Sequence, residues 1–208
     1  MRRGRGKMLK RVSDVMLTVL SMPLWLPVVG IVALAVRWSL GSPVFFRQAR
    51  GGFRGRVIEV LKFRTMTDER DRDGKLLADA QRLTRLGRAL RSLSLDELPG
   101  LFNVIRGDLS LVGPRPLIAD YVLLYTAHQA RRHEVRPGIT GWAQINGRNA
   151  LTWEEKFDLD VWYVDNRSWV LDVRILLMTV VKVFGRDGIN SDGDVTMPRF
   201  EGSRERER

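Results

Sequence analysis

The uncharged stretch VMLTVLSMPLWLPVVGIVALAV, residues 15–36, decides how the rest of this chain is organised. As a straight helix it would be about 33 Å long, enough to cross a hydrocarbon core of about 30 Å. A cleaved signal peptide usually has a shorter apolar core that ends in small residues, whereas this stretch continues directly into Arg37 and Trp38. The sequence therefore predicts a retained membrane element within residues 1–40.

Two prolines interrupt this stretch and predict a break in its helix. Pro23 and Pro27 each lack an N–H and crowd the carbonyl four residues earlier, and their spacing places both rings on nearly the same face. Ser21 can hydrogen-bond a backbone carbonyl that the break frees. Two topologies remain open at this point: a kinked helix that crosses the membrane once, and a re-entrant helix-break-helix that enters and leaves by one leaflet.

The charges on either side of the apolar stretch favour the re-entrant form. Six cationic residues precede it, and seven more lie between residues 37 and 64. Bacterial membrane segments keep such residues on the cytoplasmic side. A spanning helix would place one of these groups outside, whereas a re-entrant hairpin keeps both inside. We also expect Lys10 and Asp14, one helical turn apart, to form an ion pair at the interface.

Composition limits the classes of partner. A chain of 208 residues that is 44% hydrophobic can form one domain with a core and an anchor, and a formal charge of +11 favours an anionic partner. The absence of cysteine excludes disulfides and thiolate metal sites. A nucleic-acid-binding protein or a membrane scaffold without catalysis are the alternatives. We expect no nucleic acid partner, because no zinc-finger or RNP signature occurs and residues 15–36 would have no role there.

Beyond residue 40 the pattern changes to short elements. Two strands are expected around a glycine-rich turn, over residues 44–48 and 57–66. Helices are expected over residues 81–93, 95–105, 118–134 and 153–165, with an interfacial or core helix over 169–184. Loops are expected over 68–79 and 137–149. We therefore expect a mostly helical, membrane-associated single domain of the α+β class, with an anchor over 1–40, a catalytic domain over 41–190 and a flexible tail over 191–208.

Asp96 and Glu97 are the candidate catalytic pair, in the motif SLDELP at residues 94–99. Taken alone, such a pair is most often the solvated start of a helix. The functional alternative makes one carboxylate a nucleophile and the other a ligand of Mg²⁺, which takes hard oxygen ligands and shares its shell with substrate phosphates. Adjacent side chains on a helix diverge by about 100°, so the two carboxylates would have different roles.

Basic residues in three other motifs are candidates for binding phosphate. Lys62 and Arg64, in KFRTM at residues 62–66, would point to one face of a strand and suit a pyrophosphate. Arg115 lies between two prolines in GPRP, so it loses little freedom on binding. Arg148 ends the glycine-rich stretch PGITGWAQINGRN, whose backbone amides could hold phosphate oxygens. The alternatives are a solvated strand face, an ordinary turn and a structural loop.

In this order, KFRTM, SLDELP, GDLSLVGPRP and PGITGWAQINGRN resemble the motifs of the bacterial sugar transferase family, the monotopic phosphoglycosyl transferases. The resemblance covers residues 10–189 and implies transfer of a sugar-1-phosphate from a UDP-sugar to polyprenyl (undecaprenyl) phosphate, the first step of membrane glycoconjugate assembly. It implies a covalent phosphosugar-aspartyl intermediate on Asp96, release of UMP, and Mg²⁺ held with the help of Glu97. Lys62, Arg64, Arg115 and Arg148 match basic positions around the phosphates.

The resemblance also implies a location. It supports a re-entrant anchor broken near Ser21, Pro23 and Pro27, with the active site on the cytoplasmic face of the bacterial inner membrane. One departure from the family pattern is that Met22, rather than serine, directly precedes Pro23. Larger family members carry further membrane helices and another domain, so we expect this chain to be the minimal catalytic form.

Overall fold

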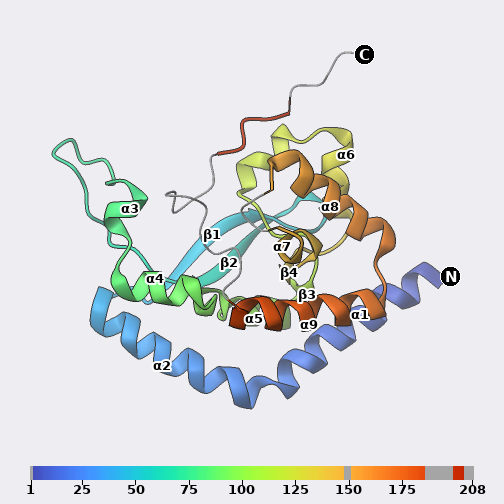
Figure 1. The fold of residues 1–208 in the computed structure, drawn as a ribbon, viewed down its shortest axis with the longest axis horizontal. Helices are drawn as coiled ribbons and strands as arrows, with labels where there is room; N and C mark the ends of the chain where they lie inside the picture. Colours follow the sequence, from blue (N-terminus) through green and yellow to red (C-terminus); the bar gives the residue numbers. More distant parts are fainter. Residues whose placement is uncertain (1, 148–150, 186–198, 204–208) are drawn as a thin grey trace.

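Two long helices at the amino terminus form a wide V along one side of the molecule (Figure 1). In the computed structural model, which describes residues 2–147, 151–185 and 199–203, helix α1 spans Arg2–Leu20 and helix α2 spans Met22–Leu40. Ser21 lies at the vertex. Within the described residues, α2 alone is long and apolar enough by composition to cross a membrane.

Side-chain hydrogen bonds at the vertex replace backbone bonds that the break removes. The Ser21 hydroxyl donates to the carbonyls of Leu17 at 2.8 Å and Thr18 at 3.2 Å. The indole N–H of Trp25 donates to the same Thr18 carbonyl at 3.0 Å. Pro23 lies in the first turn of α2, where a missing N–H removes no helical bond, and Pro27 lies inside α2. The predicted break is confirmed, and it lies at Ser21, ahead of both prolines.

The remaining elements are short, apart from two helices near the carboxyl end. They are β1 (Phe45–Gly51), the 3-10 helix η1 (Phe53–Gly55), β2 (Val57–Phe63), α3 (Asp79–Arg82), α4 (Arg85–Ser92), the 3-10 helix η2 (Leu95–Glu97), α5 (Gly100–Arg106), β3 (Ser110–Val112), the 3-10 helix η3 (Ala119–Leu124), α6 (Ala127–Ala130), the 3-10 helix η4 (Arg131–Glu134), β4 (Gly138–Thr140), α7 (Trp142–Ile145), α8 (Trp153–Asn166) and α9 (Trp169–Gly185).

Two small sheets lie between the V and the outer helices (Figure 1). β1 and β2 form the predicted antiparallel hairpin, with Phe45 opposite Phe63 and Gly51 opposite Val57. β3 and β4 pair in parallel through residues 110–112 and 138–140, a contact that was not expected. The described residues are therefore mostly helical with two two-stranded sheets, in agreement with the expected mostly helical class that includes a small hairpin.

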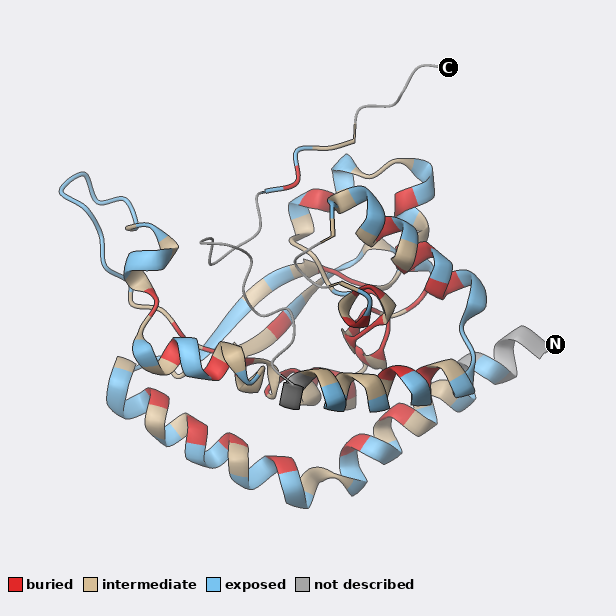
Figure 2. Ribbon diagram, in the orientation of Figure 1, coloured by how far each residue is buried: buried red, intermediate tan, exposed pale blue. Residues whose placement is uncertain are grey.

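Each arm of the V buries one face and exposes the other, as Figure 2 shows by the alternation of colours along both helices. In α2, Trp25, Val29, Val32 and Val36 are buried in a cluster that includes Phe63 of β2. The outward face of the same helix is formed by large apolar side chains, Leu24, Leu26, Ile31, Leu34 and Trp38. An exposed apolar surface of this extent is typical of a face that contacts a membrane or another protein.

Polar contacts fix α1 against the rest of the molecule. Lys10 forms the predicted ion pair with Asp14 at 3.2 Å and a second one with Asp172 of α9 at 2.8 Å. The hydroxyl of Ser110 in β3 donates to Asp14 at 2.6 Å. Arg11 donates to two carbonyls in the last turn of α5. These bonds tie the first helix to the sheet and to both helices beside it.

Two expected helices are divided by local caps. The segment expected as one helix over 118–134 consists of η3, α6 and η4, because Tyr125 is extended and Thr126 starts a new helix. Thr126 and Gln129 form a capping box, each side chain bonding to the other residue's backbone. The helix expected over 81–93 is divided likewise, since Thr84 caps α4. The expected loop over 137–149 contains β4 and α7.

Residues 199–203, within the tail expected to be flexible, pack against the domain. Phe200 is 3% exposed, and its backbone N–H donates to the hydroxyl of Tyr121 at 3.0 Å. Its ring lies in an aromatic cluster with Tyr121, Tyr125, Trp153 and Phe157. The described part of the tail thus departs from the expectation, because one phenylalanine fills a cluster built from segments distant in sequence.

Candidate active site

The carboxylate pair lies in a tight turn between α4 and α5. Ser94 adopts a left-handed conformation, with φ of 55°, immediately before η2, a conformation that residues other than glycine rarely adopt. Pro99 then interrupts the backbone bonding ahead of α5, so the expected single helix over 95–105 is divided. Asp96 is only 8% exposed. The pair is therefore not a solvated helix start.

Glu97 is held by two cations from different parts of the chain. Lys62 of β2 donates to Oε1 at 2.7 Å, and Arg115 donates to Oε1 at 2.5 Å and to Oε2 at 3.2 Å. Burial alone would raise the pKa of Glu97, but Arg115 and Lys62 hold that pKa well below its usual range. Glu97 is therefore ionised throughout the physiological pH range.

Asp96 differs from its neighbour in both bonding and charge. Its carboxylate accepts no hydrogen bond from the described residues. Burial, followed by the negative charge of Glu97, raises the pKa of Asp96 to about 6, against the opposing effect of Lys62, Arg91 and Arg115. At neutral pH this carboxylate is mainly ionised, more basic than an ordinary aspartate, and without a donor among the described residues. These are the properties of a nucleophile rather than of a structural ion-pair partner.

Two further cations lie close to the pair, and sequence reasoning missed both. Arg91, in the last turn of α4, donates from Nε to the hydroxyl of Thr65 at 3.2 Å, and its charge acts on Asp96. Arg50 of β1 interacts electrostatically with Glu97 and Arg115. The alternation of side chains along β1 could have indicated Arg50. Its side chain lies on the same face of the hairpin as those of Gln48 and Lys62.

Arg64 does not join this group, so the expected common face of Lys62 and Arg64 is wrong. β2 ends at Phe63, and the Arg64 side chain turns toward the end of α2. There it donates to the carbonyls of Leu40 and Ser42, each at 3.3 Å, and pairs with Asp68. The unpaired carbonyls at the end of a helix attract a guanidinium. Arg148, the fourth expected cation, lies outside the described residues.

Arg115 is positioned through the carbonyls of its own segment. Two prolines remove backbone donors from this segment, but its carbonyls accept hydrogen bonds from other parts of the chain. The N–H of Gly138 donates to the Pro114 carbonyl at 2.9 Å, and Arg132 donates to the Arg115 carbonyl at 2.7 Å. Arg132 is 2% exposed. It also donates to Asp160 at 2.6 Å and 3.1 Å. A buried ion pair therefore supports the residue that binds Glu97.

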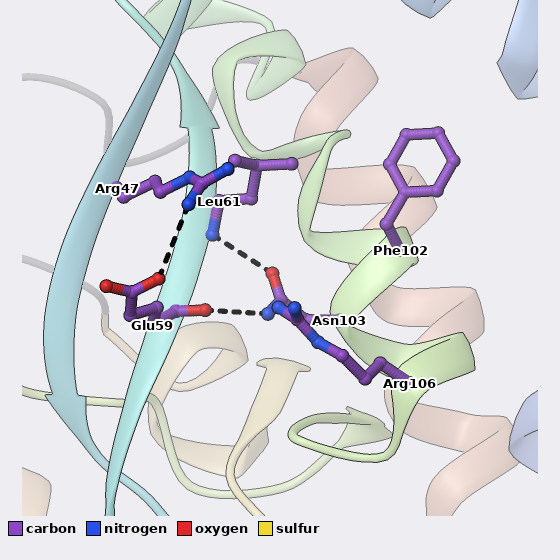
Figure 3. Close-up of a pocket in the computed structure, with 6 residues that line it drawn as sticks. All are labelled: Arg47, Glu59, Leu61, Phe102, Asn103 and Arg106. Atoms are coloured by element: carbon purple, nitrogen blue, oxygen red, sulfur yellow. Dashed lines mark hydrogen bonds and ion pairs between the residues drawn. The ribbon is translucent and has the colours of Figure 1, made fainter.

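A small cavity lies on the other side of the hairpin, between β1, β2 and α5 (Figure 3). It has a volume of about 210 Å³ and is lined by Arg47, Glu59, Leu61, Phe102, Asn103 and Arg106. Asn103 crosses from α5 to β2, where it accepts from the N–H of Leu61 at 3.0 Å and donates to the carbonyl of Glu59 at 2.7 Å. Asp96 and Glu97 do not line this cavity. Its Asn103 contacts fix α5, and with it the carboxylate turn, against the hairpin.

The carboxylate oxygens available here suit Mg²⁺, which shares its shell with substrate and water, better than a metal whose ligands all come from protein. Within the described residues, no three His, Cys, Asp or Glu side chains gather closely enough to hold an ion. A carboxylate has about four lone-pair sites, and Lys62 and Arg115 make three bonds to Glu97, which leaves Oε2 able to accept one more. Mg²⁺ is usually bound by one or two carboxylates, and substrate phosphates and water complete its coordination shell.

Comparison with known proteins gives consistent matches. The family model for bacterial sugar transferases matches residues 5–186. The uncharacterized sugar transferase EpsL of Bacillus subtilis (strain 168) is 57% identical over 195 residues, which cover 94% of this chain and 96% of EpsL. The exopolysaccharide production protein ExoY of Sinorhizobium fredii is 37% identical, with 86% of each chain covered.

Larger relatives match over part of their length. The UDP-glucose:undecaprenyl-phosphate glucose-1-phosphate transferase of Escherichia coli (strain K12) is 41% identical over 202 residues, which cover 87% of this chain and 41% of that enzyme. The chain thus spans about two fifths of this relative. The carboxylate turn, its cations and the apolar helix α2 all lie within the matched region. The chain belongs to the bacterial sugar transferase family.

Proposed function

We propose that this chain transfers a sugar-1-phosphate from a UDP-sugar to undecaprenyl phosphate at the cytoplasmic face of the bacterial inner membrane. The observation that carries the proposal is the contrast between the paired carboxylates. Asp96 is buried with no hydrogen-bond donor among the described residues, and Glu97 beside it is neutralised by Lys62 and Arg115. The substrates in the name of the Escherichia coli relative support the choice of donor and acceptor.

The proposed reaction has two displacements at one phosphorus atom. A carboxylate oxygen of Asp96 attacks the phosphorus next to the sugar, and the bond from that phosphorus to the bridging oxygen breaks, so that UMP leaves with the electron pair. A phosphate oxygen of undecaprenyl phosphate then attacks the same phosphorus. The bond to Asp96 breaks, the carboxylate is restored, and undecaprenyl-diphospho-sugar is formed. Covalent catalysis of this kind divides one difficult transfer into two easier ones.

The cations around the pair supply the electrostatics that this reaction needs. Two carboxylates face four positive side chains, Lys62, Arg115, Arg91 and Arg50, so the site has an excess of positive charge. Fixed positive charge stabilises the negative charge that develops on phosphate oxygens. Mg²⁺, when bound by Glu97 and the diphosphate, would neutralise further charge there. Glu97 thus orders two cationic side chains and keeps a lone pair for a metal.

We propose that the V of α1 and α2 is a re-entrant anchor with its vertex in the lipid. α2 is packed along the domain through Trp25 and Val36 rather than projecting away from it. A membrane-spanning α2 would draw Phe63 and Leu90, its partners in that cluster, into the bilayer. α9 adds an exposed apolar face next to α1, and its Trp169 donates to Ser13 at 3.3 Å.

A single cysteine tests this topology, because the chain contains none of its own. Leu20 is the site of choice, because it is exposed beside the vertex, the end that would reach the outer surface if α2 spanned the membrane. In whole cells, we expect Leu20→Cys to resist a membrane-impermeant thiol reagent applied from outside. Labelling from outside would show that α2 spans the membrane and would refute the re-entrant form. A cysteine at exposed Lys75 is the control for labelling after cell lysis.

The activity is tested with the purified full chain, Mg²⁺, undecaprenyl phosphate and a panel of UDP-sugars, with release of UMP as the readout. We expect one or a few UDP-sugars to yield UMP. Asp96→Asn keeps the shape of the side chain and should abolish release without changing the thermal midpoint. Normal release by that variant would refute the nucleophile. A protein that releases no UMP from any UDP-sugar would be a scaffold rather than a transferase.

A further inference from the structure

Arg50 is a partly buried cation beside the carboxylate pair, and it has no anionic partner among the described residues. Its guanidinium donates to the side-chain oxygen of Gln48 and, at 3.4 Å, to the carbonyl of Pro116. In residues 2–147, 151–185 and 199–203, no carboxylate oxygen lies within 4 Å of it. Burying an arginine with only neutral partners is unfavourable. Such an arrangement is typical of a position that binds an anionic ligand.

The strand pairing places Arg50 on the face of the hairpin that carries Lys62. Lys62 is opposite Phe46, and Arg50 is four residues further along the same strand, so both side chains point to one side. Burial and the nearby charge of Arg115 lower the pKa of Arg50 to about 10, whereas Glu97 acts in the other direction. Arg50 therefore shares the electrostatic environment of the site, and the fixed cations beside it disfavour its charge.

The two ends of this cationic face of the hairpin lie next to different parts of the molecule. At one end, Phe63 packs against α2, the helix with the exposed apolar surface. At the other end, the N–H of Gly51 donates to the carbonyl of Leu117. This end of the β1–β2 hairpin lies near α8, away from α1 and α2 (Figure 1). Phe46 is opposite Lys62, and Arg50 lies four residues further along β1, a distance of about 13 Å along the strand. A lipid phosphate entering from α2 reaches the Lys62 end first, and a soluble nucleotide reaches the Arg50 end.

We propose that Arg50, oriented by Gln48, binds the phosphate on the nucleoside side of the donor diphosphate, the phosphate that departs with UMP. This inference rests on the proposed function. It assigns Arg50 to the water-soluble substrate and leaves Lys62, at the membrane end, closer to the lipid phosphate. The guanidinium gains there the anionic partner that the described residues do not supply.

The test is the affinity of the full chain in nanodiscs for UDP and for UMP, measured by calorimetry. Arg50→Met should weaken binding of UDP about tenfold or more, because one charge-assisted contact is lost. Gln48→Glu keeps Arg50 but gives it a carboxylate partner, so it should weaken UDP binding in the same way without disturbing the fold. Arg47→Met is the matched control, since Arg47 lies on the opposite face of the same strand and pairs with Glu59. Its UDP affinity should equal that of the wild type.

Kinetics separate the two phosphate sources. With the UDP-sugar that supports UMP release, Gln48→Glu and Arg50→Met should raise KM for the nucleotide-sugar and leave KM for undecaprenyl phosphate unchanged. Wild-type UDP affinity in both variants would overturn the inference, as would a rise confined to the KM for the lipid. If the wild type releases no UMP from any UDP-sugar, the proposed function itself fails. Failure confined to these two variants removes only the role of Arg50.

Discussion

Asp160→Asn is the substitution that most directly probes how the site is held together. The Asp160 carboxylate is buried, and its Oδ2 accepts two hydrogen bonds from Arg132, which in turn donates to the Arg115 carbonyl. The substitution leaves the shape intact and removes the counter-charge of a guanidinium that is 2% exposed. Arg132 would then remain buried over the rings of Tyr125 and Phe157 without an anion.

The size of the effect follows from this burial. Removing one partner of a buried ion pair costs about 3–5 kcal/mol of unfolding free energy, because the other charge remains uncompensated. Replacing both partners with apolar residues is often neutral or stabilising. The pair Arg132→Met with Asp160→Leu should therefore recover most of the stability. It still lacks the donor to the Arg115 carbonyl, a charged hydrogen bond that contributes about 1.5–3 kcal/mol.

Thermal unfolding in nanodiscs and UMP release under the same conditions separate these effects. Asp160→Asn should lower the thermal midpoint strongly. The double variant should unfold closer to the wild-type midpoint than Asp160→Asn does. It should still release UMP about tenfold more slowly than the wild type, because Arg115 has lost a bond that positions it. A double variant with wild-type stability and wild-type turnover would refute the positioning of Arg115 by Arg132.

Three further predictions concern parts of the fold outside the carboxylate pair. Phe200→Ala removes the ring from its aromatic cluster, so trypsin should cleave after Arg199 faster than in the wild type; an unchanged rate would mean that the tail does not depend on this ring. Lys10→Met leaves Asp14 and Asp172 without their shared cation. It should lower the free energy of unfolding by about 2–3 kcal/mol, measured as a lower thermal midpoint. Lys75→Met, in an exposed loop, is the control and should leave the midpoint unchanged. Burial, aided by Arg132, lowers the pKa of His133 to about 4, whereas the unfolded side chain titrates near its ordinary value of 6.5. The stability that His133 contributes should therefore be constant above that pH and fall by up to about 3 kcal/mol as the pH drops toward 4, while the raised pKa of Asp96 acts in the opposite direction. His133→Gln should flatten that profile, and an equally steep profile in the variant would assign the loss to other groups.

Local patterns predicted the parts of the fold that depend on local physics. The hairpin follows from two β-rich runs around glycines, and the break at Ser21 from the proline-rich apolar stretch. The pairing of Lys10 with Asp14 follows from helical spacing alone. The division of the segment expected as one helix over 118–134 was missed, although threonine and glutamine three residues apart at Thr126 are a capping-box pattern that could have indicated it.

Contacts between distant segments were beyond such patterns. β3 and β4 are short strands that pair across about 30 residues, and neither has a strong strand signal of its own. Arg64 was assigned to the wrong partners because β2 ends at Phe63, three residues earlier than expected, and the Arg64 side chain no longer follows the alternation of the strand. The support of Arg115 by Arg132, and the packing of Phe200, depend on tertiary contacts that no periodicity reports.

The central claim is that the carboxylate of Asp96 becomes covalently bonded to the phosphosugar. The direct measurement is mass spectrometry of the full chain incubated with its UDP-sugar and Mg²⁺ in the absence of undecaprenyl phosphate. We expect the protein to gain the mass of one phosphosugar, located on the peptide that contains Asp96, and to lose it when the lipid phosphate is added. Release of UMP with no adduct, or with an adduct on another side chain, would contradict the mechanism.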